Sequence, residues 1–239
     1  PATVFLNTGL TGAQPFGWAS IARGAGGADL SAIVTSATDP NTNNAVNMVH
    51  NGTYAARVNS QDSWSGAGYG QNANSMRQTF TVDSSDVQPD GTIHLTFAYA
   101  PVMVDPGHLP EQQPYFFVGV RNLTTSQTLY EVFSLVNQAG YPWVAGATFD
   151  GFDNWFYMPW QEVDIVSTAA NPKINVGDSI EIEVVAAGCS PTGHPGYVYV
   201  DDFALAVPTG CSPTLSTITP ISGPVAGGTQ VTLTGTNLD

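Results

Sequence analysis

Residues 178–185 read DSIEIEVV, and this stretch shows most clearly which kind of fold the chain adopts. Ile180, Ile182 and Val184 alternate with polar side chains, which is the period of a strand that buries one face and exposes the other. Residues 115–123, YFFVGVRNL, repeat this period. We find no convincing stripe of apolar residues at helical spacing, and roughly eight to ten strand-like segments separated by turn residues are typical of a two-sheet sandwich. The sequence therefore predicts an all-β fold, a jelly-roll β-sandwich.

The charge of the chain excludes several classes of partner. Five Lys+Arg residues stand against nineteen Asp+Glu in 239 residues, so the formal net charge is −14. Nucleic-acid binding needs clustered basic residues, and so does attraction to anionic lipid. The sequence also lacks the run of roughly 18 apolar residues that suggests a membrane span. We therefore expect no nucleic-acid partner and no membrane insertion.

The composition changes after residue 207. Residues 1–207 hold the strand-like segments, and we expect them to form the jelly roll. Residues 208–239 begin with prolines at 208 and 213 and read as a linker that leads into a further, truncated set of strands.

The two cysteines, Cys189 and Cys211, lie in no metal-binding spacing. An even number of cysteines in a weakly charged, Thr- and Asn-rich chain favours a disulfide formed in an oxidising compartment. The alternative is a pair of buried thiols.

The C-terminal part carries a family pattern. Residues 213–239 contain the sequence SGP at 222–224, a Gly-Gly turn at 227–228, and the alternating pair Val231 and Leu233. They resemble the opening of an IPT/TIG domain, which is an immunoglobulin-like β-sandwich. The resemblance implies a partial domain, whose strands either stop short or pack on something else.

The first 207 residues resemble secreted bacterial jelly-roll modules of the carbohydrate-binding, galactose-binding-like kind. Three stretches carry the resemblance: VFLNTGL followed by PFGW near the start, HNGTYAARV leading into MRQTFTV, and CSPTGHPGYVYVDDFAL at the end. It implies an extracellular or cell-surface location and a structural Ca²⁺ held by the first strand, an early loop and the last-strand aspartate.

Asp201 is the strongest candidate for a metal ligand. Along GYVYVDDFAL it alternates in phase with Phe203 and Leu205, which are candidate core residues, so we expect its carboxylate to point inward. A buried carboxylate needs a partner, and in a chain with so few cations we expect that partner to be Ca²⁺. The resemblance adds Asn7 and Asn51 as ligands. The alternative is an aspartate that accepts backbone N–H bonds.

Two groups of aromatic side chains are candidate ligand contacts. In the loop at 141–160 we expect most rings to be buried and Trp155 and Trp160 to be exposed. On the strand at 115–123, Tyr115 and Arg121 share the face opposite the predicted core, together with Phe117. That stripe is a ligand surface unless both faces of the strand are covered.

The remaining polar residues carry weaker hypotheses. We expect His194 to pack in its loop through hydrogen bonds, and the other histidines are scattered along the sequence and predict no cluster. Asp150 and Asp153, in the sequence FDGFDNW, are expected to be solvated rather than to hold a cation.

No motif of an activated nucleophile or of a zinc protease occurs, so we do not expect an enzyme. We expect a non-catalytic, calcium-stabilised extracellular module that binds glycan or a surface protein in an adhesin-like protein. The alternative is a subunit of an extracellular filament or coat, which would self-associate by β-strand augmentation through residues 213–239.

Overall fold

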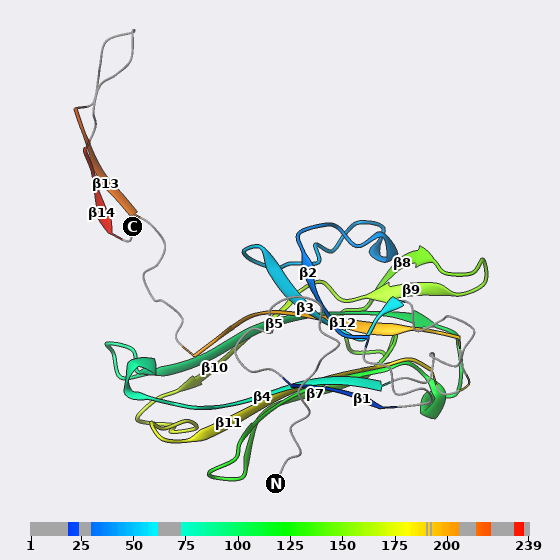
Figure 1. Ribbon diagram of the computed structural model, residues 1–239, viewed down its shortest axis with the longest axis horizontal. Coiled ribbons are helices and arrows are strands. Elements are labelled where there is room, and N and C mark those ends of the chain that lie inside the picture. Colours follow the sequence, from blue (N-terminus) through cyan, green and yellow to red (C-terminus); the bar gives the residue numbers. More distant parts are fainter. Residues whose placement is uncertain are drawn as a thin grey trace.

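A computed structural model describes residues 19–23, 30–61, 73–189, 191, 193–205, 214–220 and 232–236 (Figure 1). Asn7 and Cys211 lie outside these ranges. The described part of the chain contains strands and short 3-10 turns and no α-helix, and none of its helical turns is long or apolar enough to cross a membrane. The predicted all-β class is confirmed.

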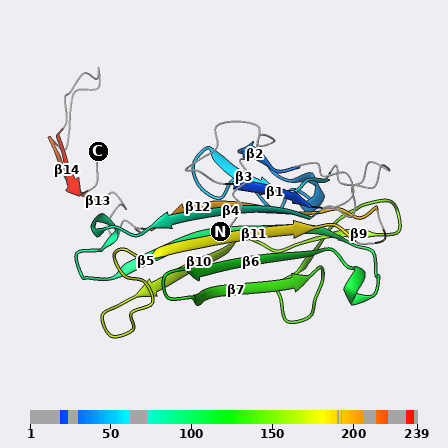
Figure 2. The same ribbon diagram turned by 60° about the horizontal axis from the view of Figure 1, so that its bottom comes forward.

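One sheet has five antiparallel strands in the order β1-β4-β11-β6-β7. Figure 2 shows β4, β11, β6 and β7 side by side in this order. The strands are β1 (Ala19–Arg23), β4 (Ala73–Thr81), β6 (Tyr115–Asn122), β7 (Gln127–Leu135) and β11 (Ser179–Ala187). Strands that are distant in sequence pair directly, which joins both halves of the chain in one sheet.

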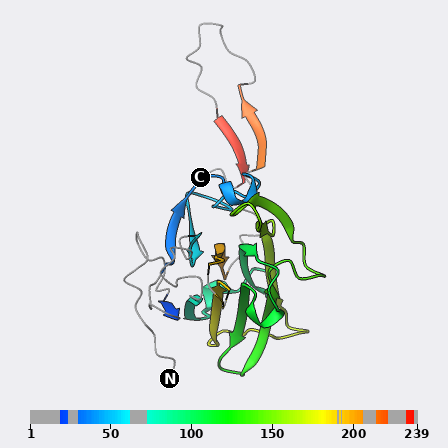
Figure 3. The same cartoon turned by 90° about the vertical axis from the view of Figure 1, so that its right-hand side faces the viewer.

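The second sheet has seven strands, in the order β2-β3-β12-β5-β9-β8 with β10 also paired to β5. Its strands are β2 (Ala32–Thr35), β3 (Tyr54–Val58), β5 (Ile93–Asp105), β8 (Val144–Thr148), β9 (Asn154–Tyr157), β10 (Gln161–Ser167) and β12 (Gly196–Ala204). The 3-10 turns are η2 (Pro40–Thr42), η5 (Ser84–Asp86) and η6 (Pro110–Gln112). Figure 3 views the strands of the two stacked sheets nearly end-on. This stack is the predicted jelly-roll sandwich.

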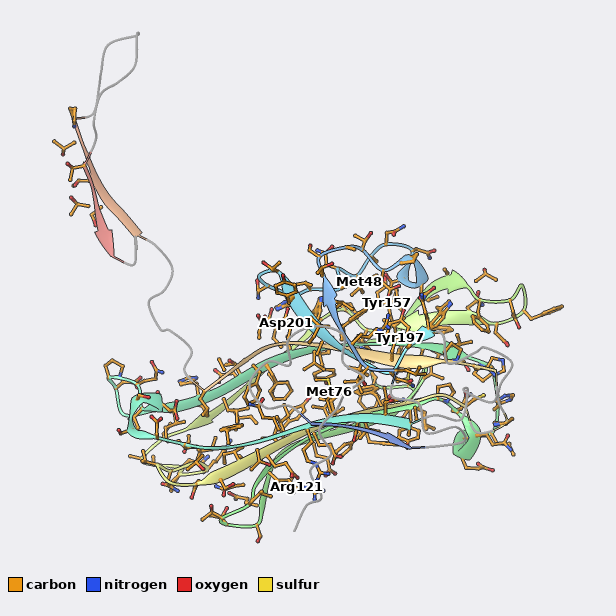
Figure 4. All side chains as sticks on the ribbon, in the orientation of Figure 1. Met48, Met76, Arg121, Tyr157, Tyr197 and Asp201 are labelled. Carbon is orange, nitrogen blue, oxygen red and sulfur yellow. The ribbon has the colours of Figure 1, made fainter. Side chains whose placement is uncertain are left out.

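The main core lies between the two sheets. Ile180, Ile182 and Val184 of β11 are fully buried there, as their alternation predicts. Met76 of β4 lies between the sheets in Figure 4, and it belongs to the same core. Each such buried aliphatic side chain stabilises the fold by roughly 1.5–3 kcal/mol relative to exposure. The period of two therefore locates the inner face of the five-stranded sheet.

A second core covers the outer face of the seven-stranded sheet. The segment at 36–53, which contains η2, lies over β3 and β12 (Figure 1), and its Val46 is buried against Tyr197 and Tyr199 of β12. The remaining members of this core are Ala100, Val102, Val104, Trp155 and Tyr157. The outer face of this sheet is therefore an interior surface around β12 and the end of β5, while its β10 part stays exposed at Glu162 and Asp164.

Asp39 ties this covering segment to the sheet. It is 1% exposed, and its Oδ2 accepts hydrogen bonds from the hydroxyls of Tyr197 at 2.6 Å and Tyr199 at 3.0 Å. Its Oδ1 accepts the backbone N–H of Asn41 at 2.9 Å, which caps η2. Burial is the main cause that raises the pKa of both tyrosines, so their hydroxyls stay protonated and donate.

Strands β13 (Thr214–Thr219) and β14 (Thr232–Thr236) pair antiparallel in a sheet of their own. These are the strands that the sequence places in the partial IPT/TIG-like segment. The assignment of residues 1–207 and 208–239 to two units stays a prediction.

We expect Asp39→Ala to destabilise the fold strongly, because it removes the acceptor of two buried hydroxyls and each polar group left without a partner costs about 1–3 kcal/mol. Asp90→Ala is the matched control, since Asp90 accepts two hydrogen bonds from Thr92 in an exposed turn. There we expect a change of about 0.5 kcal/mol. Denaturant unfolding measures both, and equal losses would contradict the role given to Asp39.

Candidate functional site

The outer face of the five-stranded sheet presents aromatic rings to solvent. Tyr115 and Phe117 of β6 are partly exposed, and Phe133 of β7 is 47% exposed. Phe133 lies directly opposite Phe117 in the register, and its ring centroid is 5.5 Å from that of Tyr115 at an interplanar angle of 36°. We call Tyr115, Phe117 and Phe133 the aromatic platform.

Gly119 makes room for the Phe117 ring. A Cβ atom built at Gly119 would lie only 2.6 Å from Cζ of Phe117, so this ring occupies the space where another residue would carry its side chain. The two residues are next but one on the same strand and share its outer face. The Phe117 ring therefore leans along β6 over the glycine.

Charged side chains border the platform. Glu131 of β7 and Glu183 of β11 lie opposite Gly119 from its two sides. One residue pair further along, Arg121 lies opposite Glu181, whose carboxylate also pairs with Arg77 of β4 at 3.4 Å. The predicted stripe of Tyr115, Phe117 and Arg121 is thus on one exposed face, and Figure 4 shows Arg121 on the side of the sandwich away from Tyr197.

The expectation that Trp155 and Trp160 are exposed is corrected by the structure. Trp155 is 4% exposed and packs in the second core against Phe149 and Tyr197. Trp160 is partly buried, and its Nε1 donates to the backbone carbonyl of Asn47 at 3.0 Å. Both rings serve to hold the segment at 36–53. The exposed ring of this loop is that of Phe152, at 91%.

Asp201 lies on a different face from the one we expected. A bulge interrupts the pairing of β12 with β5 between Asp201 and Ala204, and Asp202 adopts a left-handed backbone with φ of 58°. Phe203 therefore turns toward the main core while Asp201 stays on the outer side with Tyr199. The extra residue breaks the period of two on which the expectation depended.

The carboxylate of Asp201 binds the turn at residues 50–51. Its Oδ2 accepts the backbone N–H groups of His50 at 2.8 Å and Asn51 at 3.1 Å, and its Oδ1 accepts the N–H of Asp202 at 2.8 Å. The neighbouring Asp202 contacts the His50 ring and accepts the Asn51 side-chain amide at 2.6 Å. The structure thus brings Asp201 and Asn51 together, as the calcium hypothesis requires.

The donors at this site are N–H groups, whereas Ca²⁺ takes oxygen ligands. The described residues therefore fit the alternative given by the sequence, an aspartate that accepts backbone hydrogen bonds, better than a metal site. Calcium at Asp201, Asn7 and Asn51 stays a prediction.

His194 makes the hydrogen bonds expected of it but has additional neighbours. Its Nδ1 lies 3.2 Å from Sγ of buried Cys189, and its Nε2 lies 3.0 Å from Oδ2 of Asp153. Burial lowers the pKa of His194, and the carboxylate of Asp153 opposes this shift. His108 packs against it with ring centroids 5.2 Å apart. His108 and His194, which are far apart in the sequence, therefore lie together in the structure. The disulfide between Cys189 and Cys211 stays a prediction.

Sequence reasoning missed Phe133 and His108. Phe133 is on a strand that the alternation indicates, but its place beside Phe117 depends on the register that the β6–β7 turn sets. His108 follows β5 and meets residues more than 80 positions away. No local pattern reports either contact.

Comparison with known proteins gives one family match, which covers the C-terminal part. Residues 213–239 match the model of the IPT/TIG domain family, so that resemblance is confirmed. No curated protein matches the chain.

Several solved structures are similar at low identity. The enzymatically active domain of tailspike protein 4 from bacteriophage CBA120 is 11% identical with a TM-score of 0.32; the match covers 77% of this chain, which spans only 18% of the tailspike chain. The carbohydrate-binding module CBM27-1 of Caldicellulosiruptor saccharolyticus, solved with mannohexaose, is 12% identical with a TM-score of 0.34, covering 77% of this chain and 89% of that one. Another carbohydrate-binding module of the β-sandwich superfamily is 10% identical with a TM-score of 0.34, covering 86% and 61%. At such scores the jelly-roll assignment rests on the strand order and packing of this chain.

The hydrogen bonds of Asp201 lead to a stability prediction. We expect Asp201→Ala to lower the free energy of unfolding by about 1–3 kcal/mol, because the N–H groups that it accepts lose their partner. We expect added Ca²⁺ to leave the melting temperature of the wild type unchanged. A rise in melting temperature with Ca²⁺ that Asp201→Ala abolishes would instead establish a structural calcium site.

Proposed function

We propose that this chain is a non-catalytic extracellular or cell-surface module that binds a neutral glycan on the outer face of β6 and β7, within an adhesin-like protein. The observation that supports it is the aromatic platform. Three rings remain accessible on one sheet face, while the rings of Trp155, Tyr197 and Tyr199 on the outer side of the other sheet are buried in the second core with Val46 of the segment at 36–53.

The platform suits the apolar face of a sugar ring. Exposed aromatic rings bring a large contact area and have few rotatable bonds, so fixing them against a ligand costs the protein little conformational entropy. Tyr115 and Phe133 are close enough to contact one sugar together, and Phe117, leaning over Gly119, extends the surface along β6.

The charged border supports both orientation and selectivity. Glu131 and Glu183 can accept hydrogen bonds from sugar hydroxyls, and Arg121 can donate them. The positive charge of Arg77 is already paired with the carboxylate of Glu181, so it is less available to attract an acidic sugar. With a chain charge of −14, a neutral polysaccharide is therefore a better ligand than an anionic one.

The glycan proposal predicts that platform variants lose affinity. We expect Phe133→Ala and Phe117→Ala each to weaken binding to a neutral soluble polysaccharide roughly two- to tenfold, since one stacking contact is worth about 0.5–1.5 kcal/mol. Affinity electrophoresis in gels that contain the polysaccharides, followed by calorimetry, measures the loss. We expect no release of reducing sugar from a ligand that is retained.

Tyr54→Ala provides the control, because Tyr54 is 62% exposed but lies on β3 of the other sheet. It should bind like the wild type. Platform variants that bind as tightly as Tyr54→Ala would contradict the assignment of the site, and an absence of binding across a broad glycan array would contradict the function.

The filament or coat subunit remains a second candidate, supported by the isolated pair of β13 and β14. A two-stranded sheet is marginally stable alone, and its open edges could pair with another copy of the chain. This alternative predicts concentration-dependent assembly. A monodisperse monomer in sedimentation analysis, up to the highest attainable concentration, would count against it.

A further inference from the structure

Three loops meet at the end of the sandwich where β5 ends and β12 begins (Figure 1). His108 comes from the loop after β5, Cys189 and His194 come from the connection between β11 and β12, and Asp153 comes from the turn between β8 and β9. None of these residues belongs to the aromatic platform or to its charged border.

The donor atoms of the first three residues converge. One ring nitrogen of His108, Sγ of Cys189 and one ring nitrogen of His194 all lie within 4.8 Å of one another, and the Cys189–His194 pair is at 3.2 Å. A tetrahedral Zn²⁺ with bonds of about 2.0–2.3 Å holds its ligand atoms roughly 3.5 Å apart. The Cys189–His194 pair is already close to that separation.

His108 provides an independent sign of a missing ligand. Its Nε2 is buried and has no hydrogen-bond partner among the described residues. Leaving such an atom without a partner costs about 1–3 kcal/mol, and a metal ion bound through Nε2 would remove that cost.

Asp153 prepares His194 for the same role. Its carboxylate is 3.0 Å from Nε2, which favours the tautomer that carries its proton there and leaves the Nδ1 lone pair directed at Cys189. Carboxylate–histidine–metal arrangements of this kind are the usual outer shell of metal-binding histidines.

We propose that His108, Cys189 and His194 form a site for Zn²⁺ or a similar transition metal, with Asp153 as the residue that orients His194. Binding replaces the thiol proton of Cys189 by the metal and releases that proton to solvent. A thiolate ligand and a disulfide to Cys211 are mutually exclusive states of the same sulfur, so the site belongs to the reduced chain.

Co²⁺ is the best probe, because a tetrahedral thiolate complex has strong visible bands and a sulfur-to-cobalt charge-transfer band. The experiment uses the full chain with Cys211→Ser, which prevents the competing disulfide and leaves the three ligands in place. We expect binding of one Co²⁺ per chain with both spectral features, and displacement of Co²⁺ by Zn²⁺ but not by Ca²⁺. We also expect bound Zn²⁺ to slow alkylation of Cys189.

Variants then assign the ligands. We expect Cys189→Ser to lose the charge-transfer band, His108→Ala to weaken binding at least tenfold, and Asp153→Asn to weaken it by about 10–100-fold. His94→Ala is the matched control, because His94 also pairs with a carboxylate, that of Asp164, but on β5 away from these loops. It should bind like the parent.

Three results would overturn the proposal. One is a parent chain that binds no Co²⁺ while circular dichroism shows it folded. Another is a spectrum that Cys189→Ser leaves unchanged. A third is loss of binding in Asp150→Ala with retention in Cys189→Ser, because that pattern belongs to an oxygen-ligand site at Asp150, Asp153 and His194.

Discussion

The buried carboxylate of Asp39 determines how the two outer faces of this sandwich differ. By accepting the hydroxyls of Tyr197 and Tyr199, it fixes the segment at 36–53 over the seven-stranded sheet. Trp155 and Val46 then become core residues although they lie outside the space between the sheets. This covering buries the rings of Trp155, Tyr197 and Tyr199, whereas the rings of the aromatic platform on the outer face of the five-stranded sheet stay accessible.

How well the sequence predicts a feature depends on whether that feature is local or relies on the covering segment at 36–53. Strand alternation is a local property, so the inner faces of β6 and β11 and the stripe of Tyr115, Phe117 and Arg121 follow directly from DSIEIEVV and YFFVGVRNL. The exposure of the tryptophans is different in kind, because it depends on a segment more than 100 residues earlier in the chain. Composition identifies the aromatic loop, but only the tertiary fold decides which of its rings are covered.

Asp201 shows a second limit of sequence reasoning. Its assignment to the core assumed an unbroken period of two through β12, and one bulged residue, Asp202, places Phe203 and Asp201 on opposite sides. A left-handed aspartate is uncommon, and nothing in GYVYVDDFAL marks it beyond the two adjacent acids. The predicted meeting of Asp201 with the turn at Asn51 is nevertheless present, through N–H groups of the turn.

The platform and the cluster of His108, Cys189 and His194 lie in different parts of the molecule, the first on a sheet face and the second in the loops at one end. Rings on a strand are held in register by the sheet, so the spacing between them is set before a ligand arrives. The loop cluster instead combines residues from distant strands, and its geometry depends on how the loops pack. Binding of glycan and binding of metal are therefore separable properties of this fold.

The most direct test of the account is to map where a polysaccharide binds. NMR chemical-shift changes, measured while a neutral oligosaccharide that the chain retains is titrated in, report this residue by residue. We expect the largest changes on β6 and β7, at Tyr115, Phe117 and Phe133. Changes concentrated on the segment at 36–53 or on β3, with the platform unaffected, would contradict it.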